Sequence, residues 1–328
     1  MRIKSIKNIL AALLTFISFT AIAQDYTFSN HNVVPFSLNP ALAGNANNVR
    51  FGLNYRQQWP SLGNKYHTVR ASYDQNFFKR KCCLGVSYAM DNQAAGIYVT
   101  HDFAGTYAHC FQLKEGYYLR LGVQCSYLLN KFDYEGLSFE DQYDYGTNNI
   151  KGSSTENFDN VGKTKCADFN AGVDFNIENK LNVGVAMFHT SEPDNGFIDK
   201  EENVLHRKFV FHANYVKDLV TGKGLHSGLG ETYLFINGTF QKQDIWKQAE
   251  LGAGLFFAPF IAGITGKSDL SEITTMSLMI GTSIKTFQLY YIYDLFISDK
   301  RNGSWSHEIS MMYVFRTKER YPCPVVYW

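Results

Sequence analysis

The residues of this chain that could do chemistry do not fall at the spacing of a catalytic motif. His307-Glu308 is followed by Ile309, Ser310 and Met311, so it is not the HExxH pattern of a zinc protease. No G-x-S-x-G pattern presents a serine nucleophile. The nine histidines never cluster at ligand spacing. We therefore expect no enzyme, no metal site and no cofactor.

Cysteine content and net charge exclude two further classes. The six cysteines are too few and too scattered for a disulfide framework, and none forms a CxxC motif. The net charge is +1, which gives no argument for nucleic-acid binding. Charged residues make up 19% of the chain and aromatic residues 16%. That balance is typical of a protein with aromatic belts at two membrane–water boundaries.

Much of the chain alternates, with every second residue apolar. The clearest stretch has apolar Leu119, Leu121, Val123, Cys125 and Tyr127 interleaved with Arg120, Gly122, Gln124 and Ser126. A period of two predicts a strand with one apolar and one polar face. Many such strands behind an export signal indicate a closed transmembrane antiparallel β-barrel in a bacterial outer membrane, because a closed barrel pairs every backbone amide inside hydrocarbon.

We expect an all-β fold of about fourteen strands. They are placed near 49–58, 66–75, 82–91, 97–111, 117–129, 164–177, 180–190, 206–216, 231–241, 246–257, 259–267, 273–283, 285–295 and 304–316. An even number puts both termini in the periplasm and the long loops 130–163, 191–205 and 296–303 outside. The stretch 217–230 does not fit, because it is too long for a periplasmic turn.

The ends of the chain predict its domains. Residues 1–23 read as a secretory signal peptide, with basic Arg2, Lys4 and Lys7 before an apolar run that ends in Ala21-Ile22-Ala23. Residues 24–48 are coil with apolar side chains, which we expect to cap or enter the barrel mouth. The barrel follows over 49–316. Residues 317–328, which contain Pro322 and Pro324, are expected to form a periplasmic tail.

The alternation also predicts which charged residues face the lumen. They are Arg50, Arg56, Arg70, Asp74, Arg120, Glu250 and Glu308. The last strand must pair with the first, which brings Glu308 near Arg50 or Arg56. Two interpretations stay open: a structural ion-pair network that fills the lumen, or a selectivity ring.

Several short sequences resemble the type IX secretion system membrane proteins of the PorP/SprF family. The matching positions, in chain order, are Asn39-Pro40-Ala41-Leu42-Ala43-Gly44, Tyr55-Arg56-Gln57-Gln58-Trp59, Asp91 with Gly96, Tyr293-Asp294, and Gly303 with Ser306-His307-Glu308-Ile309-Ser310; a Cys323-Pro324 tail is a looser match. Two stretches depart from the family pattern, 217–230 and Gly263 to Lys267.

The resemblance implies an integral outer-membrane barrel of a Bacteroidetes-type bacterium that works with type IX export and gliding. It implies partners among the periplasmic ring and lipoprotein components and the C-terminal domains of secreted adhesins, with outer-membrane lipid around the barrel. It supplies no catalytic residues. Asn39-Pro40 would form a turn that fixes the N-terminal segment, Trp59 would anchor the outer rim, and Glu308 would partner Arg56 across the closing seam.

Three functions are compatible with these observations. The first is a non-enzymatic component that links the periplasmic secretion complex to the outer membrane, or helps export and anchor large adhesins. The second is a channel for small or hydrophobic solutes, which requires an open lumen. The third is an outer-membrane enzyme, with His307 and Ser310 or Ser304 as an outward pair at the rim. The partner surface is expected at the periplasmic rim.

Overall fold

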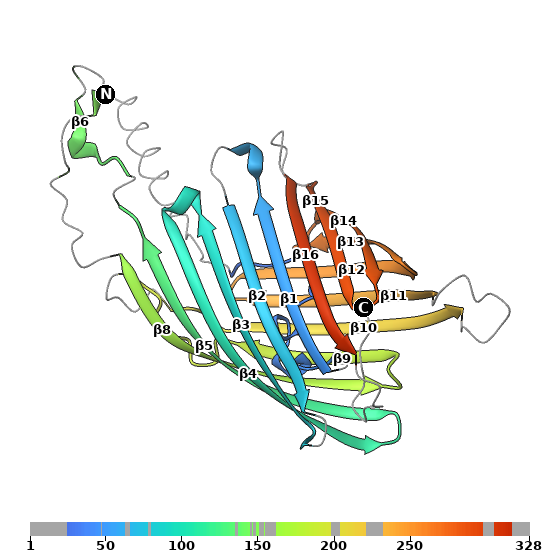
Figure 1. The fold of residues 1–328 in the computed structure, drawn as a ribbon. Coiled ribbons are helices and arrows are strands. Elements are labelled where there is room, and N and C mark those ends of the chain that lie inside the picture. Colours follow the sequence, from blue (N-terminus) through green and yellow to red (C-terminus); the bar gives the residue numbers. More distant parts are fainter. Residues whose placement is uncertain are drawn as a thin grey trace, which may run out of the picture.

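The computed structural model shows a closed antiparallel barrel of fourteen strands (Figure 1), as the alternation predicts. The structure describes residues 25–46, 48–62, 66–77, 80–134, 137–144, 146, 149–150, 154, 162–197, 204–220, 232–297 and 305–316. The first strand pairs with the last over eleven residue pairs, from Asn48 with Arg316 to Gln58 with Ser306, which closes the wall. No helix among the described residues is long and apolar enough to cross a membrane.

The barrel strands follow each other around the wall in chain order. They are β1 (Asn48–Gln58), β2 (Tyr66–Phe77), β3 (Cys82–Gln93), β4 (Tyr98–Lys114), β5 (Tyr117–Phe132), β8 (Lys163–Ile177), β9 (Leu181–Phe188), β10 (Lys208–Val220), β11 (Thr232–Gln243), β12 (Trp246–Phe257), β13 (Phe260–Ser268), β14 (Ile273–Ile284), β15 (Phe287–Phe296) and β16 (Trp305–Arg316). The short β6 (Tyr143–Asp144) and β7 (Asn149–Ile150) form a separate hairpin in the connection between β5 and β8, which the alternation did not predict.

The two ends of the barrel differ in their connections. At one end, which we call the turn end, most strands are joined by two to four residues, such as Glu115–Gly116 and Ala258–Pro259. At the other, the loop end, lie the connections 133–162 and 189–207. By its sequence, the stretch 217–230 is too long for a periplasmic turn. β10 continues to Val220, so residues 217–220 are strand, and residues 221–230 lie outside the described residues.

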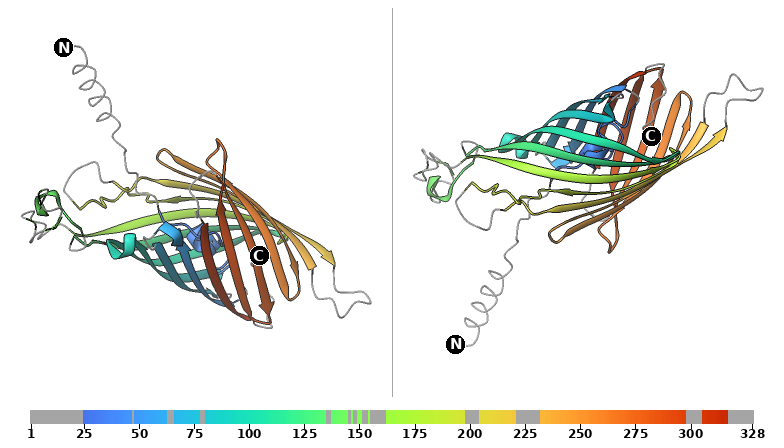
Figure 2. Two further views of the ribbon diagram at one scale, coloured as in Figure 1. Left: turned by 90° about the horizontal axis from the view of Figure 1, so that it is seen from above. Right: turned by 90° about the horizontal axis from the view of Figure 1, so that it is seen from below.

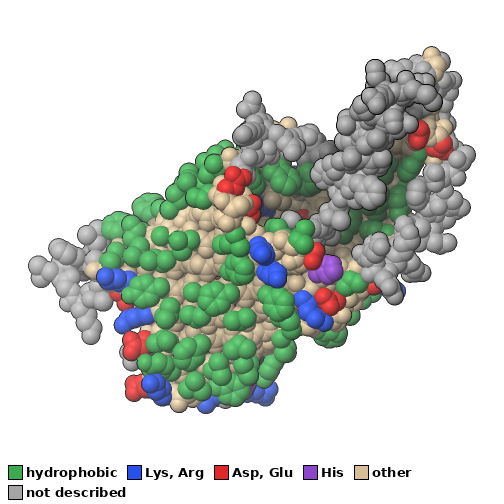
Figure 3. Space-filling view, turned by 180° about the vertical axis from the view of Figure 1, so that it is seen from behind, with side chains coloured by type: hydrophobic (Ala, Val, Ile, Leu, Met, Phe, Trp, Pro, Cys, Tyr) green, Lys and Arg blue, Asp and Glu red, His purple; other side chains and the backbone are tan. Residues whose placement is uncertain are grey.

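The outer face of the wall is apolar and the inner face is polar. Phe51, Val123 and Leu251 point outward and are 45%, 57% and 69% exposed. Figure 3 shows hydrophobic side chains spread over the rear of the wall. Inward residues are buried although they are polar, because they meet one another and the segment inside the barrel. This pattern suits a wall with hydrocarbon outside.

Residues 25–46, the N-terminal segment, lie inside the barrel, where the strands enclose them (Figure 2). The segment contains two short 3-10 turns, η1 (Pro35–Ser37) and η2 (Pro40–Leu42). Proline opens each turn because its fixed φ suits the first position and it has no amide to leave unpaired. The buried apolar side chains Val33, Phe36 and Leu42 keep this coil compact.

The N-terminal segment runs from one end of the barrel to the other. Asp25 contacts His189 and Lys208 at the loop end, whereas Asn48 pairs with Arg316 at the turn end. Asp25 therefore lies at the opposite end of the barrel from the start of β1, an arrangement that the prediction of two periplasmic termini did not include. Strand counting fixes where β1 begins, but it contains no information on the path of the coil before it.

Candidate functional site: the occupied lumen

The turn-end half of the segment lies on a floor of inward glycines. Gly122 of β5 and Gly172 of β8 are direct cross-strand neighbours, and Gly184 of β9 lies on the same inner face. A Cβ at Gly122 would collide with the backbone of Pro40 and Ala41. At Gly172 and Gly184 it would collide with the side chain of Asn39, and at Gly184 with His212 as well. Gly122 must be glycine because backbone approaches backbone there, and Gly172 and Gly184 leave the space that the Asn39 side chain fills.

Asn39 fixes the second 3-10 turn to the wall. Its Oδ1 accepts the amide of Ala41 at 2.9 Å, which caps η2. Its Nδ2 donates to the carbonyl of Val173 at 3.0 Å and lies 3.0 Å from Nε2 of His212. Asn39 and His212 are fully buried. The predicted Asn39-Pro40 turn thus joins the segment to three strands.

The segment leaves this floor at Gly44 and enters β1. Gly44 adopts a φ of 64°, which favours glycine, and its amide donates to Asp74 Oδ2 at 2.6 Å. Asp74 also accepts two bonds from Arg50, at 2.8 and 2.7 Å. Arg120 donates to the carbonyl of Ala43. The inward charged residues near the turn end, Arg50, Asp74 and Arg120, therefore bind either the backbone of the segment or one another.

A cluster of four charged residues grips the segment nearer the loop end; we call it the ionic latch, and it comprises Arg56, Lys267, Asp294 and Glu308. Glu308 accepts the amides of Ser29 and Asn30, at 2.7 and 3.0 Å. Arg56 pairs with Asp294 at 2.6 Å and with Glu308 at 3.1 Å.

Ser29 stands at the centre of the latch. Its hydroxyl donates to Asp294 at 2.8 Å and accepts from Arg56 at 2.5 Å and from Lys267 at 2.7 Å. Glu308 lies on β16 and Arg56 on β1, so the latch spans the seam where the barrel closes. Of the two partners predicted for Glu308, the geometry selects Arg56; Arg50 pairs with Asp74 instead.

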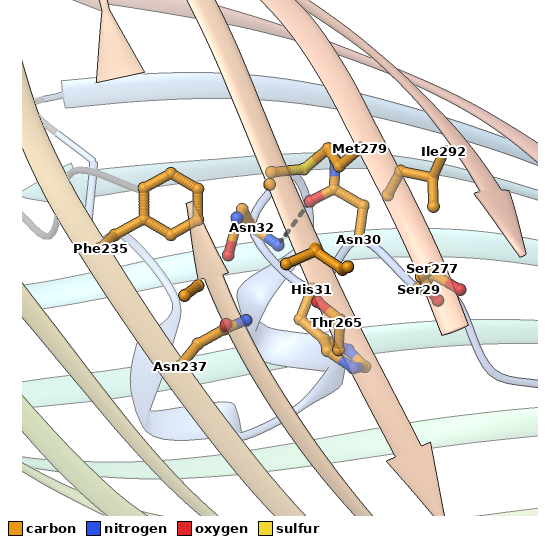
Figure 4. Close-up of a pocket in the computed structure, with 13 residues that line it drawn as sticks. Ser29, Asn30, His31, Asn32, Phe235, Asn237, Thr265, Ser277, Met279 and Ile292 are labelled. Atoms are coloured by element: carbon orange, nitrogen blue, oxygen red, sulfur yellow. Dashed lines mark hydrogen bonds between the residues drawn. The ribbon is translucent and has the colours of Figure 1, made fainter. Parts of the chain in front are cut away.

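A small polar cavity separates the segment from strands β11 to β15 (Figure 4). It has a volume of about 20 Å³, room for one or two water molecules. Asn30, His31 and Asn32 line one side, and Asn237 and Met279 line the other. Beside it, His31 Nε2 lies 3.3 Å from Glu250. The cavity is far too small to be a path for solutes.

A second charged group holds the segment at the loop end; we call it the mouth clamp, and it comprises Asp25, Asp168, His189 and Lys208. Asp25 lies 3.0 Å from His189 and 3.3 Å from Lys208, and His189 also contacts Asp168 at 3.0 Å. Burial alone would raise the pKa of Asp25, but His189 and Lys208 hold it far below its usual range. Burial would lower the pKa of His189, but Asp25 and Asp168 raise it to about 9.

Tyr26 links the clamp region to the opposite wall. Its hydroxyl donates to Asp102 at 2.8 Å and accepts from Arg70 at 2.7 Å. The Arg70 guanidinium also lies 5.1 Å from the centre of the Tyr26 ring and 5.6 Å from that of Phe28. Arg70, like the other charged residues predicted to face the lumen, points inward.

Three of the predicted residues lie away from the segment: Asp91, Trp59 and His307. Asp91 faces inward on β3 and accepts from Thr68 and Gln93, at 2.6 and 2.7 Å. Trp59 follows β1 at the loop end, where its ring packs on Tyr66 and Phe296. Its role as an interfacial anchor stays a prediction.

His307 points out of the barrel. Its Nδ1 lies 2.8 Å from the hydroxyl of Tyr291, on the same outer face. Ser310 points inward and donates to Glu308 at 3.2 Å, so these two residues do not form the outward pair of an enzyme. Ser304 lies outside the described residues. Among the described residues, no group of three or more His, Cys, Asp or Glu could hold a metal ion.

The sequence did not identify several residues on either side of the contact between the segment and the wall. Asp25, Ser29 and His31 belong to a coil whose pattern has no period. Lys267 and His212 do alternate inward, but nothing marked them as partners of a coil. The usable signal was the inward glycines: Gly122 and Gly172 interrupt the polar face of adjacent predicted strands, which indicates a close approach from inside.

Three comparisons with known proteins complete the description. A family model described as "Type IX secretion system membrane protein PorP/SprF" matches residues 20–313. No curated protein matches the chain.

Among solved structures, the chain is similar to the CymD monoaromatic hydrocarbon channel, with 11% identity and a TM-score of 0.47 over 91% of this chain and 96% of that one. It is also similar to the P. putida toluene transporter TodX, with 7% identity and a TM-score of 0.43 over 89% and 95% of the two chains. The KdgM porin matches with 7% identity and a TM-score of 0.39, over 81% and 99%. These likenesses are too distant to support an argument about function.

Proposed function

Because this chain belongs to the PorP/SprF family of type IX secretion system membrane proteins, whose model matches residues 20–313, we propose that it is a docking barrel of that system. It is an outer-membrane component with a structural or transport role. In our proposal it links the periplasmic ring and lipoprotein components to the outer membrane, or helps to export and anchor large surface adhesins through their C-terminal domains.

The observation that supports docking over conduction is the occupied lumen. The backbone of Ser29 and Asn30 is bonded to Glu308, and that of Pro40 and Ala41 lies against Gly122, so the segment meets the wall at two separate levels. A channel for small or hydrophobic solutes would need this segment to leave. That would break the hydrogen bonds that Ser29 and Asn30 make to Arg56, Asp294 and Glu308, and would remove the packing of Pro40 and Ala41 against Gly122, which is costly.

The proposal includes processing and orientation. Residues 1–23 act as the signal peptide and are removed, and residues 317–328 form a periplasmic tail. Both ranges lie outside the described residues, as does Cys323-Pro324. We place the loop end outside the cell, because outer-membrane barrels have short periplasmic turns and longer extracellular loops.

The periplasmic partner surface is narrower than the sequence suggested. The N-terminal segment is buried in the lumen, where Phe36 and Asn39 are both 0% exposed, so it is not offered to a periplasmic partner. The remaining candidate is the turn end with the tail after Arg316. The tail carries Lys318 and Arg320 against one acidic residue, Glu319, and follows Arg316 at the end of β16, so the positive charge there suits an acidic patch on a lipoprotein.

Affinity purification from native outer membranes with mass spectrometry tests this function. We expect type IX ring or lipoprotein components, or adhesin C-terminal domains, to co-purify with the full chain. Deleting residues 317–328 should leave the barrel assembled, as judged by its altered gel migration without boiling, and should reduce the captured partner several-fold. Unchanged capture would count against the tail, and capture of no type IX component by the full chain would count against the docking role.

A further inference from the structure

The N-terminal segment connects the two ends of the lumen by a continuous series of contacts. At the turn end, Gly44 donates to Asp74. Near mid-height, Asn39 donates to Val173. Closer to the loop end, Ser29 and Asn30 donate to Glu308. Each of these contacts lies nearer the loop end than the one before it. Between Phe36 and Gly44 the chain makes a sideways loop, from Gly85 of β3 to Gly172 of β8 and back to Cys83 of β3.

The segment has enough residues to cross the barrel. A strand of about 12 residues is ~40 Å long, and a tilt of ~40° leaves ~30 Å along the barrel axis. About 20 extended residues reach ~65 Å, so the segment can cross even with two 3-10 turns. The length therefore allows a chain that enters β1 at the turn end to begin at the loop end, where Asp25 contacts His189 and Lys208.

The first described residues are fixed at the loop end from two sides. His189 follows β9 and Lys208 opens β10, and both contact Asp25. Across the mouth, Arg70 of β2 and Asp102 of β4 hold Tyr26. At pH 7 Asp25 is ionised and His189 is positively charged, so their contact is attractive.

We propose that the N-terminus of the mature chain is displayed on the cell surface, because residues 25–46 cross the lumen from the periplasmic turn end to the extracellular loop end. The exposed N-terminus is thus a surface that an extracellular protein can reach and a periplasmic protein cannot. This inference rests on the processing and orientation proposed above and is independent of which partners bind the tail.

Epitope accessibility in intact cells tests the proposal with the full chain. One epitope is inserted after Gln24, a second within the β6–β7 hairpin, and a third after Trp328, each in a separate variant. Antibody labelling is measured before and after the outer membrane is permeabilised. Altered gel migration without boiling confirms that each variant is a folded barrel.

We expect the Gln24 epitope and the hairpin epitope to be labelled on intact cells to within about two-fold of each other, and the Trp328 epitope only after permeabilisation. If the hairpin epitope is labelled on intact cells and the Gln24 epitope is not, the segment does not reach the surface and the inference is overturned. If only the Trp328 epitope is labelled, the orientation is reversed and the inference is also overturned. The first result would leave the proposed periplasmic partners of the tail unaffected. The second would place the tail outside the cell and would therefore contradict periplasmic docking as well. The purification tests the partners of the tail separately.

A second pair of variants tests whether the N-terminus reaches the cell surface through the lumen or by another route. Gly172→Val fills the space of Asn39, whereas Gly105→Val adds a side chain on the outer face of β4, where no atom lies within 4 Å of a Cβ. In folded protein, we expect Gly172→Val to reduce surface labelling of the Gln24 epitope several-fold and Gly105→Val to leave it unchanged. Equal labelling of the two variants would overturn the route through the lumen.

Discussion

The two halves of the N-terminal segment are held by different forces. The turn-end half, residues 33–46, fits a floor of glycines and is bonded through Asn39; its charged contacts, to Asp74 and Arg120, are made by its backbone. The loop-end half, residues 25–32, is held by the ionic latch and the mouth clamp. Close packing depends on shape and little on salt or pH, whereas ion pairs near the mouth respond to both. The turn-end half is therefore the permanent anchor, and the loop-end half is the part that conditions can loosen.

The largest effect should come from removing one partner of the buried latch. Arg56→Met leaves Glu308 without its cation and Asp294 with only Lys267, at 4.0 Å, and we expect it to lower the free energy of unfolding by about 3–5 kcal/mol. Denaturant unfolding of the barrel in lipid vesicles measures this. Arg207→Met is the matched control, because Arg207 is half-exposed and its pair with Glu192 lies on the surface. If the two variants lose the same free energy of unfolding, the buried latch stabilises the barrel no more than a surface ion pair does.

A smaller effect is expected from one methyl group on the glycine floor. Gly122→Ala places a Cβ against the backbone of Pro40 and Ala41, and we expect a loss of about 1–3 kcal/mol. Gly105→Ala carries the same change in backbone freedom with no atom within 4 Å, so it should be neutral or slightly stabilising. Unfolding in vesicles compares the two. If Gly122→Ala is as stable as Gly105→Ala, the segment is not seated on this floor.

Asn39→Ala should cost about 1–2 kcal/mol, because it removes the cap of η2 and a buried bond to Val173. Asn32→Ala is the control: for Asn32 the structure records only a backbone bond, to Asn30, and we expect a change within about 0.5 kcal/mol. Hydrogen exchange of residues 35–46 should rise in the first variant alone. Equal exchange in both would contradict the role of Asn39.

The smallest effect is the pH response of the mouth clamp. His189 has its pKa raised from 6.5 to about 9, so its stabilisation is complete below pH 6.5 and is lost as pH rises through 9. Asp25, whose pKa is lowered, stays ionised throughout this window. We expect hydrogen exchange at residues 25–28 to increase between pH 6.5 and 9.5, by on the order of 1 kcal/mol of opening free energy, after correction for intrinsic rates. His189→Gln should respond less; an identical pH profile would assign the response to another group.

The same comparison shows how much the sequence could predict. Alternation located all fourteen strands because a wall between oil and water imposes a period of two on every strand, including the weaker stretches near 92–111 and 259–283. It also gave the inward direction of Arg56 and Glu308, and their pairing follows from closure of the barrel. These features repeat along the chain, so a local pattern is enough to find them.

The path of the N-terminal segment could not be predicted in this way. Ser29 and Asn39 belong to an aperiodic coil, and their partners Glu308 and Val173 lie far along the chain. Only the closed barrel brings these residues together. The motif around Asn39-Pro40 was noticed by resemblance, but its physical reason, a fit against Gly122 and Gly172, requires the three-dimensional structure.

Single-channel recording tests the central claim most directly, namely that the chain's own N-terminal segment seals the lumen. The purified full-length barrel is inserted into a planar lipid bilayer at neutral pH, and current is recorded at moderate voltage. Our account predicts no steady conductance from the full chain, because residues 25–46 and the inward side chains fill the lumen. A stable open conductance from the intact protein would contradict the claim and would favour a channel over a docking barrel.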